Sequence, residues 1–66
     1  MRTFELLKVA SDDTVLNIYD SELLLIAICD GTPVPKVIIT AEIDKIDPPF
    51  QGRINVILKE KREDLI

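Results

Sequence analysis

The sequence LLLIAIC, residues 23–29, is an unbroken apolar run with an acid at each end, Glu22 and Asp30. A strand or helix with one face in water carries polar residues on that face. A run that is apolar at every position therefore predicts a strand covered on both sides. The run is far shorter than the roughly 17–25 residues of a membrane-spanning helix, so we expect no membrane association.

The 66-residue chain has little material of its own with which to cover such a run. We expect a single small domain over residues 1–66, and a domain of this size buries only about 60% of the surface of its unfolded chain. Small domains often gain stability from a disulfide, a metal or oligomerisation. One cysteine, Cys29, and no histidine exclude an intramolecular disulfide and argue against a zinc site. The sequence favours a homo-oligomer, with a dimer as the first expectation.

The overall composition indicates an acidic, folded protein. Hydrophobic residues make up 47% of the chain, which excludes a disordered tail. The formal net charge of −4 repels phosphate backbones, so nucleic acid is a disfavoured partner. Few amides and a Lys/Glu-rich end are compatible with a thermophilic source. The first residues lack the basic-then-apolar order of a signal peptide, so we expect a cytoplasmic location.

The fold prediction depends on short segments with strand-like patterns. These segments are 2–9, 15–19, 23–29, 37–44 and 54–58. Turn-forming residues separate them, and short turns favour pairing between consecutive strands. Closing the sheet would also protect its edges, which are strongly aliphatic. We therefore predict an all-β fold, a small antiparallel barrel or half-barrel with four to five strands.

Helices are an alternative at two places. Asp20 or Ser21 could cap a helix over residues 21–30, with Gly31 as its stop, which would give an α+β chain of order β-β-α-β-β. Residues 54–65 also approach helical spacing. The charged C-terminal tail, residues 59–66, is expected to be frayed or to form a short helix.

We find no constellation of residues that predicts chemistry. The absence of histidine removes the commonest general base and closes the Ser-His-Asp and Cys-His schemes. Cys29 ends an apolar strand, so we interpret it as a buried hydrophobic residue. The aspartates lie in turn-like sequence, where such side chains bond to their own backbone. We predict no catalytic residue, no metal site, no cofactor and no enzymatic activity.

The apolar residues predict an interface instead. Ile38 and Ile57 occupy the otherwise polar faces of their predicted strands, and the central run has a second apolar face. Such a surface is larger than a soluble monomer normally exposes. We predict a non-enzymatic, self-associating β module that binds a protein partner or scaffolds a complex. Its predicted interface consists of Leu24, Ile26, Ile28, Ile38 and Ile57.

The sequence also allows two other functions. A small nucleic-acid-associated regulator would use a basic C-terminal edge, made by Arg53, Lys59, Lys61 and Arg62, although acids alternate with these cations. An enzyme shared between subunits would instead use the acids, with Asp12 and Asp44 as candidate ligands for a divalent ion.

Overall fold

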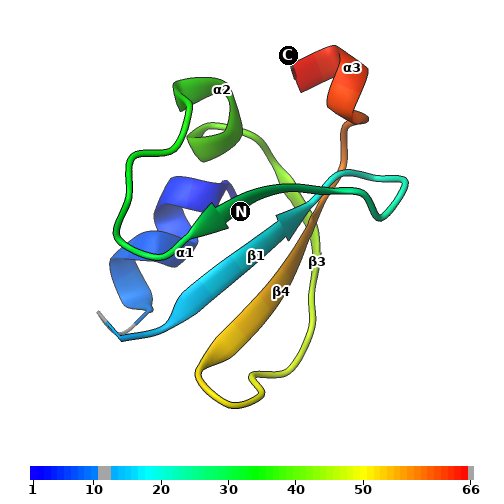
Figure 1. Ribbon diagram of the computed structural model, residues 1–66. Helices are drawn as coiled ribbons and strands as arrows, with labels where there is room; N and C mark the ends of the chain where they lie inside the picture. The colour runs from blue at the N-terminus through cyan, green and yellow to red at the C-terminus, as the bar shows by residue number, and fades with distance from the viewer. Residues whose placement is uncertain (11–12, 66) are drawn as a thin grey trace.

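The computed structural model describes residues 1–10 and 13–65 (Figure 1). The described residues form three short helices and four strands. In chain order they are α1 (Thr3–Val9), β1 (Val15–Tyr19), β2 (Leu25–Cys29), α2 (Lys36–Ile39), β3 (Ile43–Ile46), β4 (Arg53–Leu58) and α3 (Arg62–Leu65).

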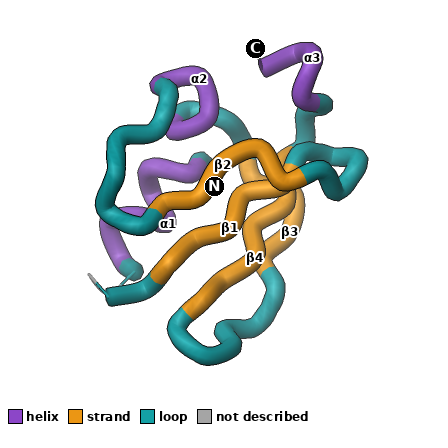
Figure 2. Tube along the Cα trace, in the orientation of Figure 1, coloured by secondary structure: helices purple, strands orange, loops and turns teal. Residues whose placement is uncertain are grey.

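The four strands form one mixed sheet of order β2-β1-β4-β3 (Figure 2). Strand β1 pairs antiparallel with β2 and parallel with β4, and β3 pairs antiparallel with β4. The mainly β content was predicted correctly, but the antiparallel barrel or half-barrel is wrong, because the sheet is mixed and is not closed. After α2 the chain continues as β3 at the far edge of the sheet and then returns as β4 between β3 and β1. Strands β2 and β3 are therefore the opposite edges of an open sheet.

A single core lies between the sheet and the helices. Alternate residues of the two central strands point into it, Leu16 and Ile18 from β1 and Val56 and Leu58 from β4. Each helix adds one large side chain to the same core: Leu6, Ile38 and Leu65. The helices therefore cover one face of the sheet, and the other face carries the half-buried residues between the core positions.

The strand predicted over residues 2–9 is wrong, because residues 3–9 form helix α1. Thr3 and Leu6 are three positions apart and both are buried, as on one face of a helix. The helix begins where the Glu5 carboxylate accepts a 2.8 Å hydrogen bond from the backbone nitrogen of Arg2. This bond satisfies a donor at the helix start, as in a capping box. The imperfect alternation of this segment reflects the helix.

Residues 37–44 alternate clearly, but they do not form the predicted strand. Helix α2 starts after Pro35, whose carbonyl accepts hydrogen bonds from the backbone nitrogens of Ile38 and Ile39 at 3.0 and 3.2 Å. Proline has a fixed φ angle and no N–H, so it suits a helix start. Strand β3 begins only at Ile43.

The helix predicted as an alternative at residues 21–30 is also wrong, because residues 25–29 form strand β2. The order β-β-α-β-β nevertheless occurs, with α2 as its helix. Of the segment 54–65, the first part belongs to β4 and only residues 62–65 are helical, as α3 within the charged tail.

Candidate functional site

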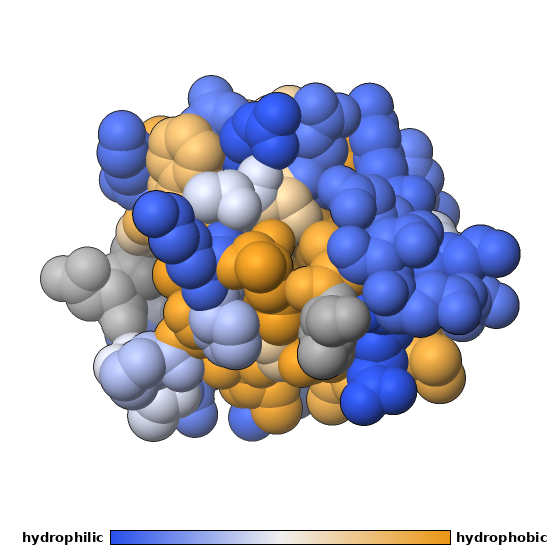
Figure 3. Space-filling model, turned by 90° about the horizontal axis from the view of Figure 1, so that it is seen from above, coloured by the Kyte–Doolittle hydropathy of each residue, from blue (hydrophilic) through white to orange (hydrophobic). Residues whose placement is uncertain are grey.

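Strand β2 and the loop before it expose large aliphatic side chains. Leu23, Leu24, Leu25 and Ile28 are 64%, 55%, 52% and 41% exposed, while Ile26 and Ala27 are partly buried against the core. We call residues 23–28 the apolar edge, because β2 is a terminal strand of the sheet. Seen from the end of the molecule at which α2 and α3 lie, apolar side chains form a continuous area between hydrophilic margins (Figure 3).

A β-bulge explains why two residues of β2 point away from the core. Ala27 pairs with Ile18 and Leu25 pairs with Tyr19, so Ile26 is an extra residue without a counterpart. A bulge of this kind shifts the side-chain alternation by one position. Leu25 and Ile28 therefore both lie on the open face of the sheet.

The open face is apolar at one end and polar at the other. Leu25, Tyr19 and Ile57 are neighbours across β2, β1 and β4. In the adjacent row, the side-chain nitrogen of Asn17 donates a 3.1 Å hydrogen bond to the side-chain oxygen of Asn55. The apolar edge therefore continues onto the sheet through Tyr19 and Ile57.

Asp20 holds the loop that carries the exposed leucines. Its side chain is buried, and Oδ1 accepts 2.9 Å hydrogen bonds from the backbone nitrogens of Glu22 and Leu24. Its Oδ2 accepts a 2.9 Å bond from the backbone nitrogen of Arg62 at the start of α3. These bonds lower the pKa of Asp20, and the bond from the backbone nitrogen of Leu24 has the largest effect on it. One buried carboxylate thus holds the loop at three backbone nitrogens.

Asp30 closes β2 in a similar way. Its Oδ1 accepts hydrogen bonds from the hydroxyl and the backbone nitrogen of Thr32, at 2.7 and 3.2 Å. The pKa of Asp30 is lowered mainly by the Thr32 hydroxyl, and the charge of Arg53 adds to the effect. Asp20 and Asp30 thus confirm the prediction that turn aspartates bond to the local backbone.

A hollow of about 310 Å³ lies beside the end of β2. The described residues that line it are uncharged: Leu7, Ala10, Thr14, Cys29, Gly31, Thr32, Pro33, Val34 and Ile39. Cys29 is buried, as predicted, and burial raises the pKa of its thiol. A protonated thiol is a poor nucleophile. The hollow therefore offers packing surface rather than reactive groups.

The structure brings together most, but not all, of the predicted interface. Leu24, Ile26 and Ile28 belong to the apolar edge, and Ile57 lies on the open face. The placement of Ile38 on an exposed strand is wrong, because this residue lies in α2 and is only 2% exposed. Leu23, Leu25 and Tyr19 were missed. The first two are part of the apolar run, but nothing in the run itself indicates the bulge.

The four basic residues named above do not gather on one surface. Arg53 and Lys59 stand at opposite ends of β4, roughly 20 Å apart, since a strand rises about 3.3 Å per residue. The ammonium group of Lys59 is 3.3 Å from a carboxylate oxygen of Glu42. This arrangement gives no support to a nucleic-acid interface.

The acids give no support to a divalent-ion site. Asp12 lies outside the described residues, and Asp44 is exposed on β3. Within residues 1–10 and 13–65, there is no group of three or more Cys, Asp or Glu residues that could hold a metal ion.

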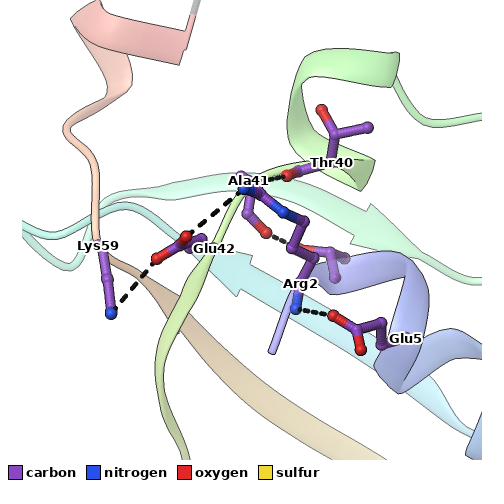
Figure 4. Close-up of polar contacts among 7 residues, drawn as sticks. Arg2, Glu5, Thr40, Ala41, Glu42 and Lys59 are labelled. Carbon is purple, nitrogen blue, oxygen red and sulfur yellow. Dashed lines mark hydrogen bonds and ion pairs between the residues drawn. The ribbon is translucent and has the colours of Figure 1, made fainter.

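The opposite edge of the sheet is built differently (Figure 4). The N-terminal residues run beside the start of β3, where Thr3 donates a backbone hydrogen bond to Ala41 at 3.1 Å and Ile43 donates one to Met1 at 2.8 Å. Arg2 lies 3.5 Å from Glu42, which also pairs with Lys59. Charged and paired groups thus occupy this edge.

Comparisons with protein-family models, curated proteins and solved structures each found no match to this chain. Across the part of the chain that the structure describes, no helix has the length and apolar content needed to cross a membrane.

Proposed function

We propose that this chain is a non-enzymatic protein-binding module that self-associates along β2. The observation that supports this function most strongly is the apolar edge, where four large aliphatic side chains on a terminal strand and the loop before it are 41–64% exposed. A terminal strand has unpaired backbone groups, and apolar side chains along it favour the addition of another strand. Exposed apolar patches of this kind typically mark interaction sites.

A second copy of the chain fits this edge because the edge is uncharged. Residues 23–29 carry no charge in a chain whose net charge is −4, so acidic groups of the two copies approach each other only beyond the ends of the paired strands. In an antiparallel pair of β2 strands about a two-fold axis, Leu25 and Ile28 of both copies would lie on the same face of the joined sheet. Aliphatic cross-strand pairs stabilise sheets.

Association would also compensate for the small size of the domain. Among the residues that the structure describes, ten hydrophobic residues form the buried core, and a core of this size leaves a thin margin of stability. A complex that forms only from folded copies stabilises the folded state by mass action. We therefore expect the thermal midpoint of unfolding to rise with protein concentration.

Sedimentation velocity of two matched variants tests the proposal. Leu25→Lys puts a charge on the apolar edge, whereas Val9→Lys makes the same kind of change at an exposed position on α1. We expect the unmodified protein and Val9→Lys to form dimers at micromolar to millimolar concentrations, and Leu25→Lys to be monomeric. A monomer at every concentration for the unmodified protein would contradict the proposed function.

A further inference from the structure

We propose that the apolar edge also accepts, by strand addition, an extended segment of another protein that is apolar and then basic towards its C-terminus. This segment would compete with a second copy of the chain for β2. The inference builds on the proposed function, because it uses the same edge. It goes further by defining the partner through its sequence and its direction.

The direction follows from the geometry of strand pairing. Antiparallel pairs are slightly more stable per residue than parallel pairs, so we expect an added strand to run opposite to β2. Strand β2 runs from Leu25 to Cys29. The C-terminal end of the added strand would therefore lie beside the loop at residues 20–24, and its N-terminal end would lie beside Asp30.

The loop end of β2 is acidic. The backbone nitrogen of Ser21 donates a 2.9 Å bond to the carbonyl of Glu60, and Arg62 is bonded to Asp20, so the loop and the start of α3 lie side by side (Figure 1). Acids outnumber cations in these two segments. The acids are Asp20, Glu22, Glu60, Glu63 and Asp64, and the cations are Lys61 and Arg62.

The Asp30 end of β2 is closer to neutral. Nη1 of Arg53 donates a 3.4 Å hydrogen bond to Oδ1 of Asn17, which pairs with Ile28 of β2, so the Arg53 guanidinium lies towards this end of the strand. An added strand therefore gains little from a charge at its N-terminal end. Lysine or arginine residues after the apolar part would instead meet the acidic loop, where ion pairs at the rim of an interface favour the correct partner and direction.

A second copy of the chain lacks this complementarity. In an antiparallel β2 pair, Asp30 of each copy follows the strand and lies towards the acidic loop of the other copy. Like charges that face each other across a pair of strands are destabilising. A segment with a basic tail therefore binds more tightly than a second copy and displaces it, which converts self-associated chains into monomers with a bound partner.

Peptide binding tests both sequence and direction. Three labelled, capped heptapeptides serve as probes: VTVTVKK, the reordered KKVTVTV and the acidic VTVTVEE. We expect fluorescence anisotropy to show that VTVTVKK binds about fivefold more tightly than KKVTVTV, the effect of two modest ion pairs, and that VTVTVEE binds most weakly. Equal affinity for the first two peptides, or no binding of VTVTVKK, would overturn the inference.

Two charge variants locate the effect. Glu22→Lys changes the acidic loop, and Asp44→Lys makes the same charge change at an exposed position on β3. We expect Glu22→Lys to remove the preference for VTVTVKK and Asp44→Lys to preserve it. The opposite pattern would show that the preference arises from overall charge or from the β3 edge, and would also overturn the inference.

Sedimentation in the presence of saturating VTVTVKK separates this inference from the proposed function. We expect dimers to become monomers with bound peptide. Dimers that persist without binding peptide would refute the inference and leave self-association standing. A chain that is monomeric without peptide, yet binds VTVTVKK in the predicted direction, would refute self-association and support the inference.

Discussion

The two edges of the sheet differ in chemistry although they belong to the same small domain. The β2 edge is five residues of strand without a charge, preceded by exposed leucines. The β3 edge carries Asp44 and Lys45, and the N-terminal residues pair with its start. Charges and added pairing are common means of protecting an edge strand. The chain thus protects one edge, and this indicates that small size alone does not explain the exposure of the other.

A bulge is present at both edges, so it does not account for the difference. The register shifts between Ile43 and Lys45 in β3, and between Ile18 and Tyr19 where β1 meets β2. The extra residue of β3 is the exposed Asp44, whereas that of β2 is the partly buried Ile26. The bulge in β3 therefore exposes the charge of Asp44. The bulge in β2 shifts the alternation of side chains and thereby exposes Leu25.

The largest loss in the free energy of unfolding is expected for a residue of the core rather than for a residue at an edge of the sheet. Ile38→Ala removes most of a buried side chain from the core, and we expect a loss of about 3 kcal/mol in the free energy of unfolding. Leu25→Ala at the apolar edge should cost under about 1 kcal/mol in monomeric protein, because little burial is lost. Urea denaturation at low protein concentration measures both. Similar losses for the two variants would contradict the difference in burial.

Acid should weaken the loop that supports the β2 edge. The hydrogen bonds to Asp20 lower its pKa below the ordinary value of 3.8, so the carboxylate contributes stability that is fully present above that pH. This contribution is lost as the pH falls through the pKa of the folded state. We expect the urea midpoint to decrease below about pH 4.

The matched variant for this test is Asp20→Asn, which keeps one side-chain oxygen acceptor but does not titrate. We expect it to be less stable at neutral pH and to lose less stability in acid than the unmodified chain. An identical acid profile for both proteins would assign the acid sensitivity to other carboxylates.

Removing the charges from the β3 edge should change the type of assembly. In Asp44→Leu/Lys45→Leu, both edges would be apolar, and we expect the closed dimer to give way to open-ended oligomers, since two different adhesive edges allow continued addition. Static light scattering against concentration would reveal a growing mass. An unchanged dimer would show that the charges of β3 do not protect it.

The smallest loss in the free energy of unfolding is expected when the ion pairs at the β3 edge are removed. Glu42→Gln removes both the 3.5 Å contact with Arg2 and the 3.3 Å contact with Lys59. All three side chains are about half exposed, so the loss in the free energy of unfolding should be below about 1 kcal/mol and should shrink in high salt. Thermal denaturation at two salt concentrations measures this. A large, salt-independent loss would indicate that the edge depends on these pairs.

The strands were predictable where local pattern and tertiary environment agree. Residues 15–19, the 25–29 part of the apolar run and residues 54–58 are all in strands. The helices α1 and α2 were not predicted. Their positions depend on burial of Leu6 and Ile38 against the sheet, which alternating aliphatic sequence does not reveal.

The candidate site was only partly predictable for a related reason. The surplus of apolar surface at residues 23–28 follows from the sequence, because no polar residue interrupts the run. The bulge at Ile26 and the bond between Asp20 and Arg62, which are 42 positions apart in sequence, depend on the assembled fold. These two features decide which leucines point outwards and hold them in place.

Hydrogen–deuterium exchange at several protein concentrations compares the two edges most directly. If copies associate through β2, the backbone amides of residues 25–29 become more protected as the concentration rises, while those of residues 43–46 do not change. Protection that is independent of concentration at both edges, or that increases only at β3, would contradict the claim that β2 is the edge at which this chain associates.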